Sequence, residues 1–85
     1  MASEDHKSLQ VEYFASLREQ SGVDTEQVST SAGTPRELYE ELSARHGFSL
    51  APEVVKVAIN GDFASWDAAL CSDDHIVFIQ PVAGG

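Results

Sequence analysis

Cysteine is nearly absent from this sequence. Cys71 is the single cysteine among 85 residues, so no disulfide can form within the chain and none supports the fold. This usage is typical of a reducing compartment, and we expect a cytoplasmic protein. The three histidines, His6, His46 and His75, lack the spacing of metal ligands. With one cysteine, no zinc site of the usual type can be drawn, and we expect no metal.

Positive charge is also scarce. Five Lys and Arg stand against 14 Asp and Glu, which gives a formal net charge of −9. Binding to nucleic acid needs clustered Lys and Arg, so we expect no nucleic-acid partner, and an anionic membrane surface is disfavoured for the same reason. The acidity fits either a solvated surface, which we favour, or electrostatic steering onto a basic partner.

Long apolar runs are missing as well. No segment approaches the roughly 20 apolar residues of a membrane span, and the polar residues 1–7 lack the apolar core of a signal peptide. A chain of 85 residues makes one small domain with little room for an enclosed pocket and a catalytic constellation. We therefore expect a carrier, a binding module or a subunit with no bound cofactor, in preference to a self-sufficient enzyme.

The best-marked element is a helix predicted over residues 35–46. In residues 34–37 a threonine is followed by a proline at the first helical position and by a glutamate that can reach back, which is a capping box. Gly47 ends the helix. Leu38 and Leu42 lie on one helical face, and this face needs an apolar sheet to cover it.

The remaining elements are strands and one short helix. The last predicted strand, at residues 75–80, lacks an alternation of apolar and polar side chains. This indicates that the strand is buried on both faces or that a partner covers one of its faces. One helix packed across a mixed sheet of four to five strands is the economical α+β arrangement, with residues 8–81 as the domain, residues 1–7 as a mobile tail and residues 82–85 as a flexible tail. In chain order we predict a strand at 9–14, a short helix at 15–20 ended by Ser21-Gly22, a weak strand at 25–30 antiparallel to the first, the helix at 35–46, a strand at 55–60, a turn-rich segment holding Phe63 and Trp66, and a strand at 75–80.

The sequence ends in a glycine pair. Pro81 terminates the most apolar strand, and Val82, Ala83, Gly84 and Gly85 follow. Glycines at a chain end have no side chain to bury, so a frayed end is the simplest interpretation. The alternative is a tail without side chains that enters a narrow channel of another protein and presents the carboxylate of Gly85 there.

Three segments together resemble the β-grasp, ubiquitin-like sulfur carriers, and specifically the small subunit of molybdopterin synthase, the MoaD family. Residues 11–19 (VEYFASLRE) are similar to the first strand and helix of that family. Residues 57–61 (VAING) resemble its middle strand, and residues 73–85 (DDHIVFIQPVAGG) resemble its last strand and glycine-glycine ending. The similarity covers nearly all of residues 9–85.

Two positions depart from the family pattern. His75 stands where the family usually has Glu, and Gln80 stands where it usually has the first of two prolines. A glutamine there is similar to the related ThiS sulfur carriers of thiamine biosynthesis, which are usually shorter and lack the early helix predicted at 15–20.

The resemblance implies a reaction in which Gly85 is the reacting residue and the other active-site groups belong to partners. An E1-like adenylyltransferase would use ATP to activate the Gly85 carboxylate, and a sulfurtransferase persulfide would then give a thiocarboxylate. The tail, Pro81 to Gly85, would enter the large subunit of the synthase, in a heterotetramer, and donate sulfur to cyclic pyranopterin monophosphate. The chain itself would be a non-catalytic, sulfur-donating subunit.

Three alternatives stay open. The same adenylate could serve a ubiquitin-like modifier that is conjugated to target proteins through Gly85. The chemistry could belong to thiamine biosynthesis instead of molybdenum cofactor biosynthesis. A β-grasp interaction domain with an inert tail is the third possibility.

Strand periodicity also predicts a partner-binding face. Neighbouring residues of a strand point to opposite faces of the sheet. If the residues next to Phe14, Val77 and Ile79 face the helix, then Phe14, Val77 and Ile79 point away from it, together with Phe63. An exposed apolar patch of this kind usually marks an interface. The resemblance implies partner contact at Phe14, Phe63 and Ile79 and a basic contact at Arg18. The alternative for each aromatic residue is an ordinary core or edge position, and for Phe63 the two interpretations are balanced.

Some residues that suggest chemistry have simpler explanations. We interpret Cys71 as a small, partly buried apolar residue and not as the sulfur-carrying thiol. Asp73 and Asp74 fit a solvated turn better than a pair of catalytic carboxylates. Tyr39 and Trp66 are expected to be packing residues.

Overall fold

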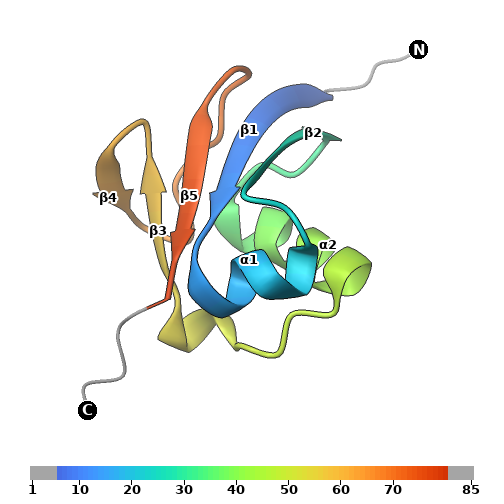
Figure 1. Ribbon diagram of the computed structural model, residues 1–85. Coiled ribbons are helices and arrows are strands. Elements are labelled where there is room, and N and C mark those ends of the chain that lie inside the picture. The colour runs from blue at the N-terminus through green and yellow to red at the C-terminus, as the bar shows by residue number, and fades with distance from the viewer. Residues whose placement is uncertain (1–5, 81–85) are drawn as a thin grey trace.

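A five-stranded mixed sheet forms the centre of residues 6–80, the part of the chain that this computed structural model describes (Figure 1). The strand order is β2-β1-β5-β3-β4. The central pair, β1 and β5, is parallel, and the other neighbours are antiparallel, which includes the pairing predicted for the first two strands. The strands are β1 (Lys7–Tyr13), β2 (Thr25–Thr30), β3 (Lys56–Ile59), β4 (Asp62–Ala64) and β5 (His75–Ile79).

The main helix α2 (Pro35–His46) has the bounds that the sequence predicts. The Oγ1 atom of Thr34 accepts a hydrogen bond from the Glu37 N–H at 3.2 Å. The Glu37 carboxylate reaches back to the Gly33 N–H at 2.8 Å, one residue earlier than a standard capping box. The short α1 (Ala15–Ser21) ends at Gly22 as predicted, and a 3-10 turn, η1 (Pro52–Val54), precedes β3. Within residues 6–80, none of the helices is long and apolar enough to cross a bilayer.

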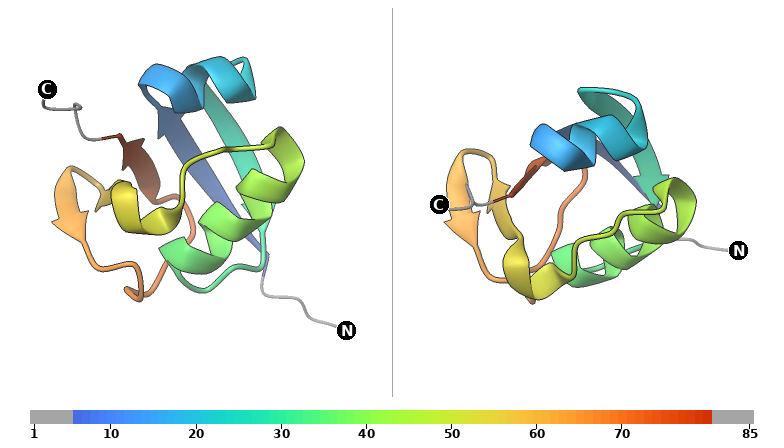
Figure 2. Two further views of the ribbon diagram at one scale, coloured as in Figure 1. Left: turned by 90° about the horizontal axis from the view of Figure 1, so that it is seen from below. Right: turned by 60° about the horizontal axis from the view of Figure 1, so that its bottom comes forward.

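The core lies between α2 and one face of the sheet (Figure 2). Tyr39 of α2 packs edge-on against Phe78 of β5, with ring centroids 5.1 Å apart, and Trp66 stacks on Phe78 at 5.8 Å. These contacts confirm the packing roles expected for Tyr39 and Trp66. Burying each large apolar side chain contributes about 1.5–3 kcal/mol. The residues buried in this core are Leu9, Val11, Tyr13, Leu17, Val28, Ala32, Leu38, Tyr39, Leu42, Val55, Val57, Leu70, Ile76 and Phe78.

The first strand begins two residues earlier and ends one residue earlier than predicted, so Lys7, which pairs with Thr30, belongs to the sheet and not to the tail predicted at 1–7. β1 stops at Tyr13, and Phe14 is the N-cap residue of α1. The chain leaves the strand because Ala15 adopts a left-handed conformation with φ of 54°. The middle and last strands are also shorter than the predicted 55–60 and 75–80, since ladder pairing covers only 56–59 and 75–79.

The last strand is buried on one face only. Ile76 and Phe78 are fully buried, whereas Val77 and Ile79 are half-buried. Burial of β5 on both faces, one of the two interpretations of its apolar sequence, is therefore not found. The other interpretation, a face that a partner covers, remains a prediction.

Cys71 is exposed, so the expectation that it is partly buried was wrong. Leu70 before it turns into the core, and the chain then makes a surface turn in which the Cys71 N–H donates to an Asp74 carboxylate oxygen at 2.8 Å. The cysteine side chain is left on the outside of this turn. Asp73 and Asp74 belong to the turn, as predicted, and Asp73 has φ of 72°.

Candidate functional site

A row of side chains crosses the sheet on the face that points away from α2. The strand register pairs Glu12 with Val77, Val77 with Ala58, and Ala58 with Phe63. Successive side chains of a strand point to opposite faces, and the neighbouring row that contains Tyr13 and Phe78 is buried under α2. The first row therefore lies on the outer face, where Phe63 is 75% exposed.

Phe14 and Ile79 lie at one end of the same face. The parallel register pairs Tyr13 with Phe78, so the next residues along, Phe14 and Ile79, are level with each other. Phe14 is 43% exposed. The structure thus brings Val77, Ile79 and Phe63 to one side of the sheet with Phe14 beside them, and we call these four residues the outer apolar patch.

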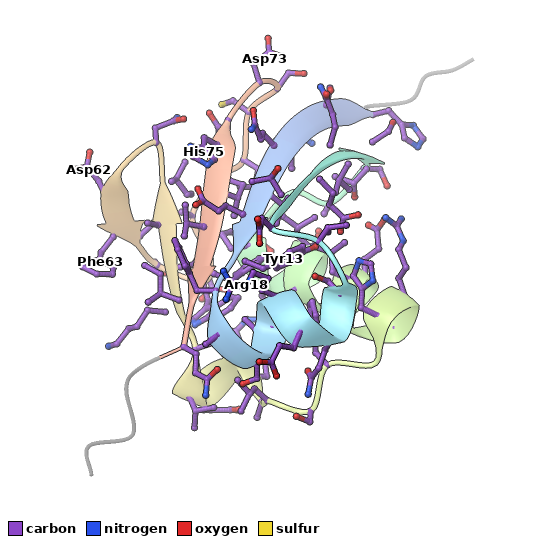
Figure 3. All side chains as sticks on the ribbon, in the orientation of Figure 1. Tyr13, Arg18, Asp62, Phe63, Asp73 and His75 are labelled. Atoms are coloured by element: carbon purple, nitrogen blue, oxygen red, sulfur yellow. The ribbon has the colours of Figure 1, made fainter. Side chains whose placement is uncertain are left out.

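Phe63 occupies the free edge of this patch. It comes from β4, the edge strand, and points outward there (Figure 3). An exposed aromatic side chain on an edge strand contributes little to the core, and apolar patches of this kind mark interaction sites. Its exposure favours the contact interpretation over an ordinary core position.

Arg18 lies on α1, away from the turn that carries Asp73 (Figure 3). Its Nε atom is 3.5 Å from an Asp24 carboxylate oxygen, and its side chain is 53% exposed. An exposed ion pair of this kind contributes about 0–1 kcal/mol. Arg18 is therefore open to a partner, and exchanging Asp24 for another carboxylate would have a small energetic cost.

A histidine–carboxylate pair borders the patch, and sequence analysis missed it. His75 Nε2 lies 3.1 Å from Glu12 Oε1, and the His75 N–H donates to the Asn60 side-chain oxygen at 2.9 Å. No local pattern in the sequence indicates this pair, because it depends on the parallel register of β1 and β5, whose residues are far apart in the chain.

A second missed contact lies where β5 ends. The Gln80 side-chain oxygen accepts hydrogen bonds from the Ser16 N–H at 3.2 Å and from the Ser16 hydroxyl at 2.5 Å. Gln80 is the last residue described. The predicted reacting residue Gly85 and the rest of the expected tail, Pro81, Val82, Ala83 and Gly84, lie outside the described residues.

The most strongly perturbed ionisable groups lie on the core side, away from the patch. The Tyr13 hydroxyl donates to Glu26 Oε2 at 2.5 Å, and His46 Nε2 lies 2.7 Å from the same oxygen. Burial and the Glu26 carboxylate raise the pKa of Tyr13 far above its usual value. Burial also tends to raise the pKa of Glu26, but the hydrogen bonds from Tyr13 and His46, with the charges of His46 and Arg45, outweigh it and hold this pKa below its usual value.

These groups tie α2 to β1 and β2 and do not form a metal centre. Over residues 6–80, no three His, Cys, Asp or Glu side chains come together in a way that could hold a metal ion. The cluster is a structural contact between the end of the helix and the sheet.

The arrangement defines a class of protein. A single main helix packed on a mixed sheet, with the first and last strands parallel at its centre, is the ubiquitin-like β-grasp architecture. The chain belongs to the ThiS family, whose family model matches residues 11–85.

Two relatives are similar over nearly their whole length. The molybdopterin synthase sulfur carrier subunit of Escherichia coli is 30% identical over 80 residues, which cover 91% of this chain and 99% of that protein. The molybdopterin synthase sulfur carrier subunit of Haemophilus influenzae is 36% identical over 80 residues, with the same coverage.

Solved structures with the same fold come from several organisms. Subunit 1 of a putative molybdopterin converting factor from Pyrococcus furiosus has a TM-score of 0.74 at 32% identity, over 89% of this chain and 99% of that one. The small archaeal modifier SAMP1 of Haloferax volcanii has a TM-score of 0.76 at 25% identity, over 92% and 99%. A complex of subunits 1 and 2 of the molybdopterin-converting factor from Helicobacter pylori contains a chain with a TM-score of 0.62 at 24% identity, over 92% and 99%.

Proposed function

We propose that this protein is the sulfur-carrier subunit of a molybdopterin synthase. Its similarity to two sulfur carrier subunits over 99% of their length carries the proposal. The outer apolar patch adds support, because two of its residues, Val77 and Ile79, lie on β5, the strand that precedes the glycine-glycine end in the sequence. A carrier needs these two features, a surface for partners and a reactive end that is free of side chains.

The reaction we propose takes place at Gly85. A carboxylate is a poor electrophile, so an oxygen of the Gly85 carboxylate first attacks the α-phosphorus of ATP and pyrophosphate leaves. A persulfide sulfur then attacks the acyl carbon and AMP leaves. A thiol reduces the resulting acyl disulfide and releases the thiocarboxylate. The ionised sulfur is a nucleophile that can attack cyclic pyranopterin monophosphate, after which water restores the Gly85 carboxylate.

The partners follow from the same proposal. An E1-like adenylyltransferase would bind ATP, a sulfurtransferase would supply the persulfide, and a large synthase subunit would receive the tail in a heterotetramer. The reducing cytoplasm expected from the single cysteine suits a thiocarboxylate. The outer apolar patch, with Phe14, Phe63, Val77 and Ile79, is the surface we propose for these partners, and Arg18 is its basic contact.

A ubiquitin-like modifier is the second candidate. The likeness to SAMP1, a small archaeal modifier, at a TM-score of 0.76 and 25% identity favours it. An acyl-adenylate at Gly85 could pass to a lysine amine as well as to sulfur. Recovery of covalent adducts of this chain from cells would support conjugation.

Loss of molybdoenzyme activity without a thiamine requirement, in a strain that lacks the chain, would support the molybdopterin pathway.

The direct test is reconstitution with the cognate adenylating enzyme, ATP and a sulfur source, followed by intact mass measurement. The proposal predicts a mass gain that corresponds to sulfur in place of one oxygen, located at Gly85. A chain that lacks Gly85 is the matched control and should show no gain.

A further inference from the structure

The junction between β1 and α1 has no cap of its own. Phe14, the N-cap residue, offers no side-chain acceptor. Ala15 follows it with φ of 54°, a left-handed conformation that is strained for a residue with a Cβ. The first N–H groups of a helix need partners from outside the helix, and the Ser16 N–H is one of them.

Gln80 supplies the missing cap from the other end of the chain. Its side-chain oxygen accepts both the Ser16 N–H, at 3.2 Å, and the Ser16 hydroxyl, at 2.5 Å. Both residues are half-buried, so water competes less for these hydrogen bonds than it would at an open surface. Two hydrogen bonds to one side-chain oxygen hold Gln80 in a single orientation.

The place of this contact in the chain gives it a second consequence. Gln80 directly follows β5 and directly precedes Pro81, so it is the residue from which the tail leaves the domain. Gly85 lies five residues further on and can reach at most about 17 Å from this point. Ser16 lies two residues after Phe14, so the contact also fixes the base of the tail relative to the outer apolar patch.

We propose that Gln80, through Ser16, is a positioning residue for the reactive tail. It sets the direction in which residues 81–85 leave a domain that is docked through its outer face. This inference rests on the proposed function. A tail that starts from a fixed base loses less conformational freedom when a partner orders it, so the contact favours the aligned complex without touching the reacting atoms.

The test measures adenylation of the full chain by its cognate adenylating enzyme, as ATP–pyrophosphate exchange, with the chain as varied substrate. Gln80→Ala should lower kcat about three- to tenfold, the effect of one or two ordinary hydrogen bonds, while KM changes by less than about twofold because the docking face is intact. Ser16→Ala, which keeps the backbone N–H, should have a smaller effect. Gln80→Glu keeps an acceptor oxygen and should restore most of the lost rate.

Gln20 provides the matched control. Gln20 lies on α1, the helix that also carries Ser16. Its side chain makes two hydrogen bonds, both to Ser49, at 2.8 and 3.0 Å. Gln20→Ala removes a comparable pair of hydrogen bonds that does not involve Gln80, and it should leave kcat unchanged. A wild-type kcat in Gln80→Ala, or equal losses in Gln80→Ala and Gln20→Ala, would overturn the proposal.

A second measurement does not depend on the function. Backbone ¹⁵N relaxation of the free protein should show lower order parameters for Val82 and Ala83 in Gln80→Ala than in the wild type and in Gln20→Ala. Equal order parameters in all three would contradict a fixed tail base. If wild-type chain forms no adenylate with an active enzyme, the proposed function fails, and the relaxation data still decide whether Gln80 holds the tail.

Discussion

At the residue scale, Glu26 shows how neighbours determine the chemistry of a side chain. One oxygen of the Glu26 carboxylate accepts a hydrogen bond from the Tyr13 hydroxyl and lies 2.7 Å from His46 Nε2. Although burial tends to raise the pKa of Glu26, these contacts hold it below its usual value. A carboxylate with a lowered pKa in the folded state binds fewer protons than it does in the unfolded chain. Stability therefore rises with pH through the range between the two pKa values and is lost as pH falls through the folded value.

We expect Glu26→Gln to flatten the acid limb of the stability curve. The wild type should lose stability steeply below about pH 5, where the unfolded Glu26 begins to take up a proton, and the variant should lose less over the same range. Urea unfolding between pH 3 and pH 7 measures this slope. Glu40→Gln, on the exposed side of α2, is the control and should keep the wild-type slope. Equal slopes in wild type and Glu26→Gln would contradict the assignment.

Ala15 gives a second prediction at this scale. Its φ of 54° suits glycine better than alanine, so Ala15→Gly should raise the free energy of unfolding by up to about 1 kcal/mol. Ala44→Gly, at an exposed position inside α2, should lower it by about 0.5–1 kcal/mol. Chemical denaturation of both variants checks the opposite signs, and destabilisation by Ala15→Gly would rule out strain at the junction.

At the element scale, the two faces of the sheet differ in their exposure. The inner face packs against α2 and is closed, whereas the outer face leaves Phe63 75% exposed and Phe14 43% exposed. An exposed aromatic side chain adds little to folding, but it can bury a large apolar area in a complex. Binding energy is therefore expected to concentrate at these aromatic residues.

Phe63→Thr tests this expectation. Threonine suits an edge strand, so the free energy of unfolding should change by less than about 0.5 kcal/mol. Affinity for the large synthase subunit, measured by calorimetry, should fall at least about tenfold. Val23→Thr replaces another exposed apolar residue, in the turn between α1 and β2, and should bind like the wild type. Equal affinities of the two variants would show that Phe63 does not contribute to the interface.

Local signals in the sequence predicted the elements that depend on local structure. α2 was predicted at both ends, because Thr34, Pro35 and Gly47 act within one turn of the helix. The alternation in β1 likewise predicted which of its side chains face the core, whereas the continuous apolar sequence of β5 left burial on one face or on both faces open. Neither the Gln80–Ser16 contact nor the His75–Glu12 pair could be predicted, because each joins residues more than 60 positions apart. The exposure of Cys71 was missed because it depends on how the turn after Leu70 leaves the core.

At the scale of the whole molecule, the hydrophobic core and the proposed partner-binding surface lie on opposite faces of the sheet. The inner side of the sheet is filled by the core, and within residues 6–80 no cluster of side chains could hold a metal. The outer face carries the apolar patch, and β5, which contributes two residues to this patch, is the strand that precedes the glycine pair in the sequence. This division suits a carrier that presents a reactive end to the active sites of other proteins.

The measurement that tests this account most directly is the intact mass of the chain after incubation with its cognate adenylating enzyme, ATP and a persulfide donor. The account predicts that sulfur replaces one oxygen at Gly85, and that the product disappears when ATP is withheld or Gly85 is deleted. An unchanged mass, with an adenylating enzyme shown to be active on another substrate, would contradict the carrier function and leave the β-grasp domain as an interaction module.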